Sequence, residues 1–448
     1  MPNNDIQIII RDLWSLRLQM LKDITDGPTE DGGIQQLFST QSETENSDTD
    51  AIEGRESKTR HLENAPRMID TVALCYLAIL LLRLPISLGN VYGWIMEEGF
   101  IYLRAINAIP RVMRQKLPLT LRRAFHVRTG APDLGRLYKT TLNLAAAFQE
   151  AFGMEMPKLN YPLLLFRYIS DLTLPLDVFP SVQRMSHLIK YDFGFPTSTQ
   201  KYNHLADHPE SQLILLLVIS IKLLYPFDEV ERHPTKATEP STLTVNWNVW
   251  NKVHAHPIIR SQSQSRRSIQ NFFEKTENDV FDMSHQETDE YLDWFQRTWL
   301  DAEPNERGTD IDFRKALCDM FPIKAIETPT ANEPESEQLA VLREKLQRVK
   351  VIQSSLILHQ PFEEREDLEE ERLRPGSRYR HYRSSQDIPQ NARLFFETVA
   401  KLVGLSIDML VTMVFETELK LQSWVRQQRK KEKGMDDGHD SVSPEISD

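Results

Sequence analysis

Residues 68–84 read MIDTVALCYLAILLLRL, and this stretch decides the fold class. Its apolar centre, residues 72–82, is shorter than the roughly 20 residues that a membrane-spanning helix needs, so it predicts a buried helix that stops at Pro85. A second stretch of the same character, QLILLLVISIKLLY at residues 212–225, carries Lys222 and also predicts a buried helix. Two such helices suggest a helical repeat, on composition alone.

The rest of the chain has helical rather than strand-like spacing. Apolar residues from Ile6 to Ile24 recur at intervals of three and four and predict an opening amphipathic helix, which Gly27-Pro28 ends. Val and Ile elsewhere mostly follow the helical period, so few strands are expected and the fold class is all-α. Further helices are expected after an N-cap at Ser87, over residues 134–152, after Asn160, after Asp177, and over residues 336–356, 392–403 and 407–425.

Composition divides the chain into segments. Gly, Ser, Thr, Asp and Glu dominate after the opening helix, and such a segment cannot bury enough apolar surface to offset the entropy of ordering it. The stretch from Asp436 to Asp448 has no Lys or Arg. The expected organisation is an N-terminal amphipathic helix (residues 1–25), a disordered acidic linker (26–66), a first helical repeat (67–197), a second (198–325), a helical C-terminal region (326–433) and a disordered acidic tail (434–448).

Motifs of catalysis or cofactor binding are missing from the sequence. The glycine-rich phosphate and dinucleotide loops, the G-x-S-x-G turn, the H-E-x-x-H zinc motif and C-x-x-C are all absent. The two cysteines, Cys75 and Cys318, exclude a disulfide scaffold and a four-cysteine zinc site, and suit a reducing compartment. His254 and His256 have no third ligand nearby and are interpreted as loop histidines. We therefore expect no catalytic residue, no metal site, no cofactor and no enzymatic activity.

The charge of the chain is unevenly distributed. The net charge is −12, yet the interval between Glu98 and Asp133 contains no acidic residue. Lys and Arg neutralise phosphates and release counterions, so this interval is a candidate surface for a nucleic-acid backbone. A basic surface that is merely solvated is the alternative, and composition does not decide between them. The candidate nucleic-acid-binding residues are Arg104, Arg111, Arg114, Lys116, Arg122 and Arg123.

A second basic run extends from Arg426 to Lys433. It is either a nuclear import signal or the C-terminus of a helix, where the helix dipole favours cations. The residues leave both interpretations open.

Several short stretches resemble a known family in their specific residues. These stretches are RDLWSLR (residues 11–17), LLLRLPISLG (80–89), VYGW (91–94), FIYLRAINAIP (100–110), NYPLLLFRYISDLTLPL (160–176) and RYRHYR (378–383). Those between residues 80 and 176 resemble the first cyclin repeat of the TFIIB-like subunit of the fungal RNA polymerase I core factor. The first stretch is similar to the family's helix just before the repeats.

The resemblance implies a fold, a role and a set of partners. The fold is two tandem cyclin-like five-helix repeats followed by a helical C-terminal region. The role is that of a general initiation factor for RNA polymerase I, which binds the ribosomal DNA promoter in the nucleus and nucleolus and helps to recruit the polymerase. The implied partners are the other core factor subunits, TATA-box-binding protein, RNA polymerase I and the ribosomal DNA promoter, with no membrane partner.

The chain departs from the family pattern at its start. Family members usually begin with a cysteine-ligated zinc ribbon, and no ligand cysteines occur here. Either the ribbon is lost in this lineage or the start of the gene was mis-assigned, so ribbon-dependent polymerase contacts are not carried over.

Other functions remain open from the residues alone. A cyclin-like regulatory subunit of a kinase would share the helical repeats but would have little need for an acid-free basic interval. The net acidity favours a helical scaffold without nucleic-acid binding, and an enzyme of unrecognised type is the remaining alternative.

Overall fold

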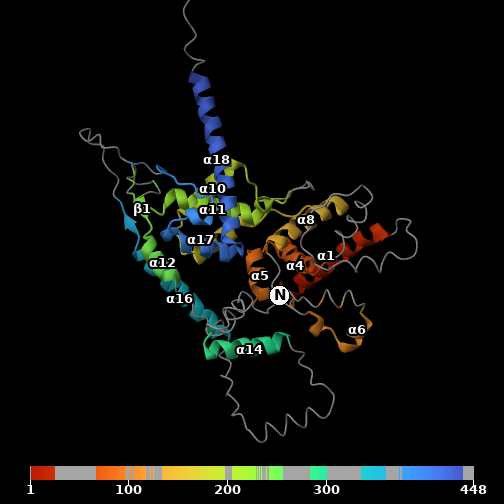
Figure 1. Ribbon diagram of the computed structural model, residues 1–448. Coiled ribbons are helices and arrows are strands. Elements are labelled where there is room, and N and C mark those ends of the chain that lie inside the picture. The colour runs from red at the N-terminus through yellow and green to blue at the C-terminus, as the bar shows by residue number, and fades with distance from the viewer. Residues whose placement is uncertain are drawn as a thin grey trace, which may run out of the picture. The chain divides into compact units, whose positions relative to one another are not determined.

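The chain divides into two compact units, one of Met1–Ala78, Val91–Leu144 and Ile258–Leu346 and the other of Ile79–Asn90, Ala145–Pro257 and Gln347–Asp448 (Figure 1). The expected linker, residues 26–66, and most of the expected acidic tail lie outside the described residues. The computed structural model describes residues 2–25, 67–96, 101–102, 105–117, 122, 125, 134–196, 204–228, 230, 232, 234, 239, 242–255, 283–299, 334–359, 373 and 376–436.

The described part of the first unit consists of helices and short connecting turns, without a strand. Four of its helices, α4, α5, α8 and α16, continue into the second unit. The elements are α1 (Pro2–Thr25), α4 (Met68–Leu81), α5 (Leu88–Met96), the 3-10 helix η1 (Ala105–Ala108), α6 (Arg111–Lys116), α8 (Leu134–Phe152), α14 (His285–Trp299) and α16 (Pro334–Ser354).

The RDLWSLR stretch attaches α1 to the start of α4. Leu13 and Arg17 are four residues apart, on one face of α1, and both are buried. The Arg17 Nη2 atom lies 3.2 Å from Asp70 Oδ2, and the same oxygen accepts a hydrogen bond from the backbone N–H of Arg67. The opening helix is therefore held by a buried ion pair as well as by apolar packing.

The second unit is built around α11, which carries the predicted apolar stretch. Every residue from Leu213 to Ile221 is at most 1% exposed, because α11 packs against α9, α10 and α18. The elements are α9 (Tyr161–Asp171), α10 (Val178–Ile189), the 3-10 helix η2 (Leu205–Asp207), α11 (Pro209–Leu224), β1 (Leu243–Thr244), α12 (Trp247–Ala255), β2 (Ile357–Leu358), the 3-10 helix η5 (Ser385–Asp387), α17 (Gln390–Val403) and α18 (Ile407–Asp436).

The predicted N-caps are correct in part. Ser87 Oγ accepts a hydrogen bond from the backbone N–H of Asn90, so Ser87 caps α5 as predicted. Asn160 precedes α9 as predicted, but its side chain donates to the carbonyl of Arg83 instead of capping the helix. The α4 helix ends at Leu81, before Pro85, because Arg83 adopts a left-handed φ of 58° and the Leu84 N–H bonds back to Ile79.

The start of α5 is fixed by two close contacts with later parts of the chain. Both carboxylate oxygens of Glu210, in the first turn of α11, accept the backbone N–H of Leu88, at 3.1 and 3.0 Å. A Cβ on Gly89 would lie 2.4 Å from the carbonyl oxygen of Leu402 in α17. Gly89 therefore lies where a larger residue would collide with the backbone of α17.

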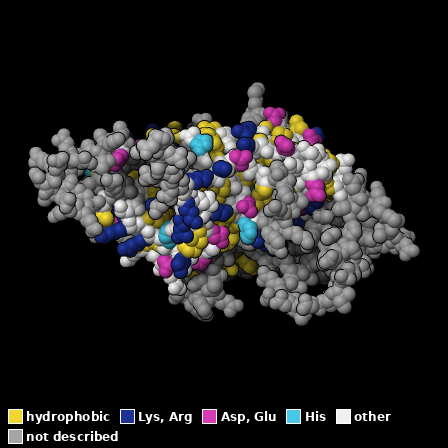
Figure 2. Space-filling model, turned by 90° about the horizontal axis from the view of Figure 1, so that it is seen from above, with side chains coloured by type: hydrophobic (Ala, Val, Ile, Leu, Met, Phe, Trp, Pro, Cys, Tyr) yellow, Lys and Arg dark blue, Asp and Glu magenta, His cyan; other side chains and the backbone are white. Residues whose placement is uncertain are grey.

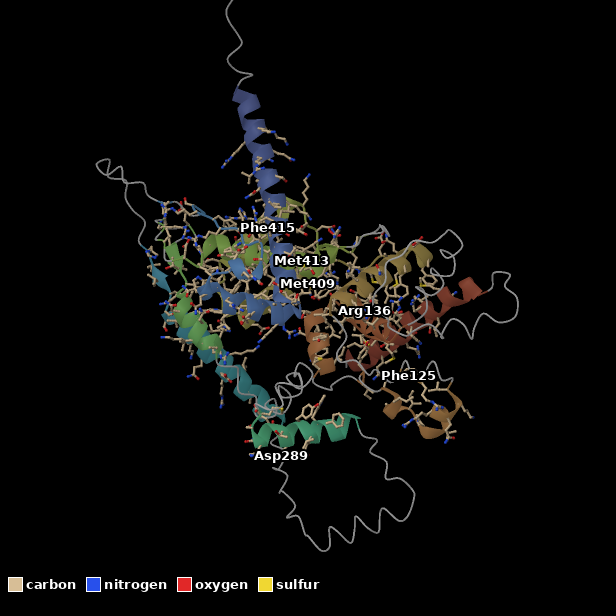
Figure 3. All side chains as sticks on the ribbon, in the orientation of Figure 1. Phe125, Arg136, Asp289, Met409, Met413 and Phe415 are labelled. Atoms are coloured by element: carbon tan, nitrogen blue, oxygen red, sulfur yellow. The ribbon has the colours of Figure 1, made fainter. Side chains whose placement is uncertain are left out.

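The C-terminal helices are longer than predicted. The α18 helix continues to Asp436, beyond the expected end at residue 425, and its last turns extend away from the rest of the second unit (Figure 1). Met409, Met413 and Phe415 lie along its first turns, where it crosses that unit (Figure 3). Strands in the described residues are limited to one antiparallel pair, in which Leu243 faces Leu358. The all-α prediction is thus confirmed, with this short ribbon as an addition.

Within the described residues, no single helix is both long and apolar enough to cross a membrane. The helices α17 and α18 reach that length and composition only as a pair, with a bend of 99° between them.

Candidate nucleic-acid interface

The predicted basic surface centres on α6, a short helix in the first unit. Pro110 precedes it with a φ of −53°, which suits the entry to a helix. Lys116, near its end, is exposed to solvent. The side chain of Arg111 is not among the described parts, and Arg104 and Arg123 lie outside the described residues. The structure therefore gives side-chain geometry for Arg114, Lys116 and Arg122 only.

Two of these arginines bond to backbone carbonyls around α6. Arg114 Nη2 donates to the carbonyl of Ile109 at 3.2 Å. Arg122 Nη2 donates to the carbonyl of Arg114 at 3.0 Å, and that carbonyl belongs to the last turn of the helix. The same carbonyl also accepts the backbone N–H of Leu117 at 3.3 Å, so Arg122 adds a second donor at the C-terminal end of α6. Both side chains are half-buried, and part of their role is to hold α6.

Exposed apolar side chains accompany this basic segment. Val112 and Met113 are consecutive residues of α6, and each is more than 60% exposed, as is Ile101 nearby in the sequence. Large apolar side chains grouped on a surface are typical of contact with another molecule. In α6 they adjoin the exposed charge of Lys116, so this helix has both the charge and the apolar area of an interface.

The second basic run forms an exposed helical face on α18. Arg426, Arg429 and Lys430 are spaced by three and four residues, and all are exposed. The helix dipole acts within about the last turn of a helix. Arg426 lies ten residues before the end of α18 at Asp436, so the dipole does not account for its position. On the side of the molecule that Figure 2 shows, Lys and Arg side chains occur with Asp and Glu side chains among them.

A buried polar cluster joins α11, α18 and the RYRHYR stretch, and sequence reasoning did not find it. Glu418 of α18 receives Lys222 Nζ at 2.5 Å, the Tyr379 hydroxyl at 2.5 Å and His381 Nδ1 at 2.6 Å. Burial lowers the pKa of Lys222, and the adjacent Glu418 opposes that shift. Burial also raises the pKa of Tyr379, so its hydroxyl stays protonated and donates. The cluster therefore fixes the RYRHYR segment against the core of the unit.

The prediction that His254 and His256 are loop residues is wrong for His254. His254 lies in α12, not in a loop, where it stacks on Trp250 and its Nε2 lies 2.9 Å from Thr173 Oγ1. Burial lowers the pKa of His254 to about 4, so it is neutral at physiological pH. His256 lies outside the described residues. No group of three or more His, Cys, Asp or Glu side chains that could hold a metal ion occurs in the described part of the chain.

Comparisons with known proteins point to one family. The model of the Rrn7/TAF1B N-terminal cyclin domain matches residues 3–111, and that of the Rrn7/TAF1B C-terminal cyclin domain matches residues 131–299. These matches confirm two cyclin-like domains. They do not test the boundaries at residues 197 and 325, which remain predictions.

Two curated proteins and one solved structure are similar over long stretches. The RNA polymerase I-specific transcription initiation factor rrn7 of Schizosaccharomyces pombe is 23% identical, over 94% of this chain and 80% of that protein. The protein of the same description from Saccharomyces cerevisiae, RRN7, is 23% identical over 57% of this chain and 51% of that protein. A chain in the crystal structure of the S. cerevisiae core factor has a TM-score of 0.52 at 15% identity, with 96% of this chain and 90% of that chain covered, a similarity of fold.

Proposed function

The chain belongs to the Rrn7/TAF1B cyclin family, whose two domain models together match more than half of its residues, and on this premise we propose its function. It is an RNA polymerase I-specific transcription initiation factor. The observation that carries this conclusion is the alignment with fission-yeast rrn7 over 94% of the chain. The protein acts by binding and not by catalysis, as initiation factors of this family do.

The partners follow from the same premise. The similarity to a chain of the S. cerevisiae core factor extends over 96% of this protein, which supports a place beside other core factor subunits. TATA-box-binding protein, RNA polymerase I and the ribosomal DNA promoter are the further partners that we propose. An initiation factor for this polymerase works in the nucleus, and we propose the nucleolus as its compartment.

Contact with promoter DNA is assigned to two basic segments. The first comprises the residues predicted from the acid-free interval, with Lys116 as the most accessible of those described. The second is the exposed face of α18 with Arg426, Arg429 and Lys430. Exposed cations suit a phosphate backbone, because each contact releases bound counterions. The first segment has no acidic neighbours in sequence, whereas Glu432 lies two residues after Lys430 in the second. A kinase-regulating cyclin would not need either segment.

Chromatin occupancy tests the proposed function. The full chain, tagged at its own locus, should be enriched at the ribosomal DNA promoter and not within the transcribed region or at promoters of RNA polymerase II. Depletion of the protein should reduce polymerase I at that promoter. Even occupancy across the genome, or an unchanged level of polymerase I after depletion, would contradict the function.

A further inference from the structure

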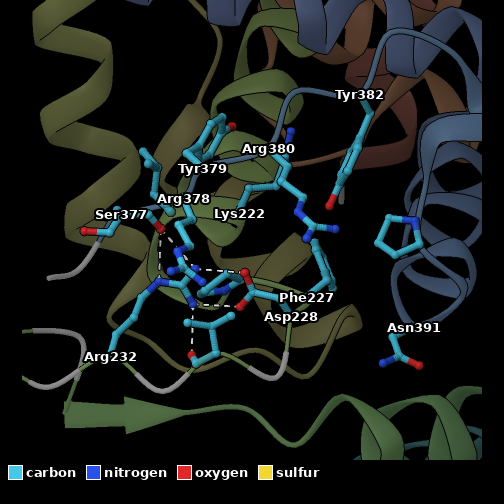
Figure 4. A pocket seen from close by; sticks show the side chains of 15 residues that line it. Lys222, Phe227, Asp228, Arg232, Ser377, Arg378, Tyr379, Arg380, Tyr382 and Asn391 are labelled. Carbon is cyan, nitrogen blue, oxygen red and sulfur yellow. Dashed lines mark hydrogen bonds and ion pairs between the residues drawn. The ribbon is translucent and has the colours of Figure 1, made fainter. Parts of the chain in front are cut away.

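A hollow of about 400 Å³ lies in the second unit beside the buried Glu418 cluster (Figure 4). One wall comes from the end of α11 and the residues that follow it, and the other from the RYRHYR segment. Phe227, Tyr379 and Tyr382 supply aromatic surface, and Pro226 and Pro389 supply apolar surface. The hollow is thus large enough for one or two side chains, and it offers an apolar group aromatic and proline surface beside the polar side chains of Asp228 and Asn391.

Two of the cations around this hollow are neutralised by acids of the chain itself. Lys222 pairs with Glu418, as described above. Arg232 makes a two-pronged ion pair with Asp228 at 2.7 and 2.8 Å, and its remaining N–H groups donate to the carbonyls of Val230 and Ser377. Since both pairs are internally matched, they add no net charge to the hollow.

Arg378 and Arg380 supply the remaining charge. Both side chains are exposed, and neither forms an ion pair in the described part of the chain. The Arg380 guanidinium lies between Tyr382 and Asp228 (Figure 4), and its charge acts to lower the pKa of both groups. The backbone of Arg378 has a left-handed φ of 56°. Residues other than glycine rarely adopt this conformation unless their surroundings constrain them.

The geometry points to an acidic peptide of a partner protein as the ligand: we propose that Arg378 and Arg380 bind its carboxylates while an adjacent apolar side chain enters the hollow. Two unneutralised guanidinium groups match two carboxylates, which they bind through paired hydrogen bonds. A nucleic-acid duplex is too wide to enter a space of this size. This inference does not depend on the proposed role in transcription.

A synthetic peptide tests the proposal on the full-length protein. The probe is a fluorescein-labelled twelve-residue peptide of Asp and Glu with one central Phe, followed by fluorescence anisotropy. We expect saturable binding that weakens with salt, and at least tenfold weaker binding to the Arg378→Ala/Arg380→Ala variant. A probe with Asn and Gln in place of the acids should bind at least tenfold more weakly to the unaltered protein.

Matched variants separate the pocket from general charge effects. Arg393→Ala and Lys401→Ala remove exposed cations from α17 and should leave the affinity for the acidic probe unchanged. The Arg378→Glu/Arg380→Glu variant should lose the acidic probe and gain a probe in which Lys replaces the acids, an exchange that misfolding would not produce. The proposal is overturned if the acidic probe does not bind, if the arginine variants bind it normally, or if those variants lose duplex DNA binding instead.

Discussion

The ammonium group of Lys222 lies 2.5 Å from a carboxylate oxygen of Glu418, and the two side chains are only 3% and 2% exposed. They come from α11 and α18, 196 residues apart in the chain. The Lys222 Nζ also lies 4.2 Å from the centre of the Tyr382 ring, a favourable position for a cation. The pair therefore joins the core helix of the second unit to the C-terminal region.

Breaking this pair should be costly. Lys222→Met leaves Glu418 buried without its cation, and the loss of one partner of a buried pair typically costs about 3–5 kcal/mol. Urea unfolding followed by tryptophan fluorescence measures the change. The double variant Lys222→Met/Glu418→Gln should recover part of the loss, because no unpaired charge then remains. A single variant within about 0.5 kcal/mol of the unaltered protein, the range of ordinary surface substitutions, would show that the pair does not stabilise the unit.

Replacement of two glycines in α5 by alanine should change the stability of the protein in opposite directions. Gly89→Ala places a Cβ against the carbonyl of Leu402, and such overpacking costs about 1–3 kcal/mol. At Gly93 no heavy atom of another described segment lies within 4 Å of the position that a Cβ would occupy, so Gly93→Ala should stabilise the helix by about 0.5–1 kcal/mol. Thermal midpoints of the two variants give the comparison. Equal shifts would refute the close approach of α17 to α5.

Much of this architecture is readable from the sequence because its signals are local. Periodicity predicts α1, the long apolar stretches predict α4 and α11, and the Ser87 N-cap depends only on Asn90, three residues away. The Glu418 cluster depends on contacts between distant segments, so no local pattern predicts its membership.

Two weaker signals of the cluster are nevertheless present in the sequence. Lys222 is the only charged residue in residues 212–225. In RYRHYR, exposed arginines at 378 and 380 alternate with the more buried Tyr379 and His381, as expected of an extended segment with one inward face. The function of the acid-free interval is undecided from the sequence for a different reason. A charge pattern does not reveal that the side chain of Arg122 bonds to a carbonyl at the end of α6.

Acid should destabilise the protein partly through His208. Burial lowers the pKa of His208 to about 3 from an ordinary value of 6.5. Below pH 6.5 the unfolded chain takes up a proton that the folded chain does not, so stability that is present at neutral pH is lost as the pH falls towards 3.

A substitution at this residue isolates its share of the acid response. The His208 side chain caps α11 by accepting the backbone N–H of Glu210. In His208→Asn the amide oxygen can accept the same N–H, and the asparagine side chain does not titrate. Between pH 7 and pH 5 the variant should lose about 2 kcal/mol less stability than the unaltered protein. Urea unfolding at the two pH values provides the measurement, and parallel losses in both proteins would show that His208 is not buried in its neutral form.

The exposed Lys116 should contribute to DNA affinity. Each phosphate contact contributes about 0.9 to the slope of log affinity against log salt for duplex DNA. In the assembled core factor, Lys116→Ala should reduce that slope by about this amount and weaken binding similarly for all sequences. Lys139→Ala, an exposed change on α8, serves as the control and should leave the slope unaltered. An unchanged slope for Lys116→Ala would assign this residue to the merely solvated surface.

Promoter-dependent transcription tests the central claim most directly. A nuclear extract of the source organism is depleted of the protein with an antibody and supplied with a ribosomal DNA promoter template and a polymerase II promoter template. Run-off transcript from the ribosomal promoter should fall by more than tenfold, return when the purified full chain is added together with its co-depleted partners, and stay low when the partners are added alone. Polymerase II transcript should not change. Full ribosomal transcription from the partners alone would contradict the assignment of this chain as a polymerase I initiation factor.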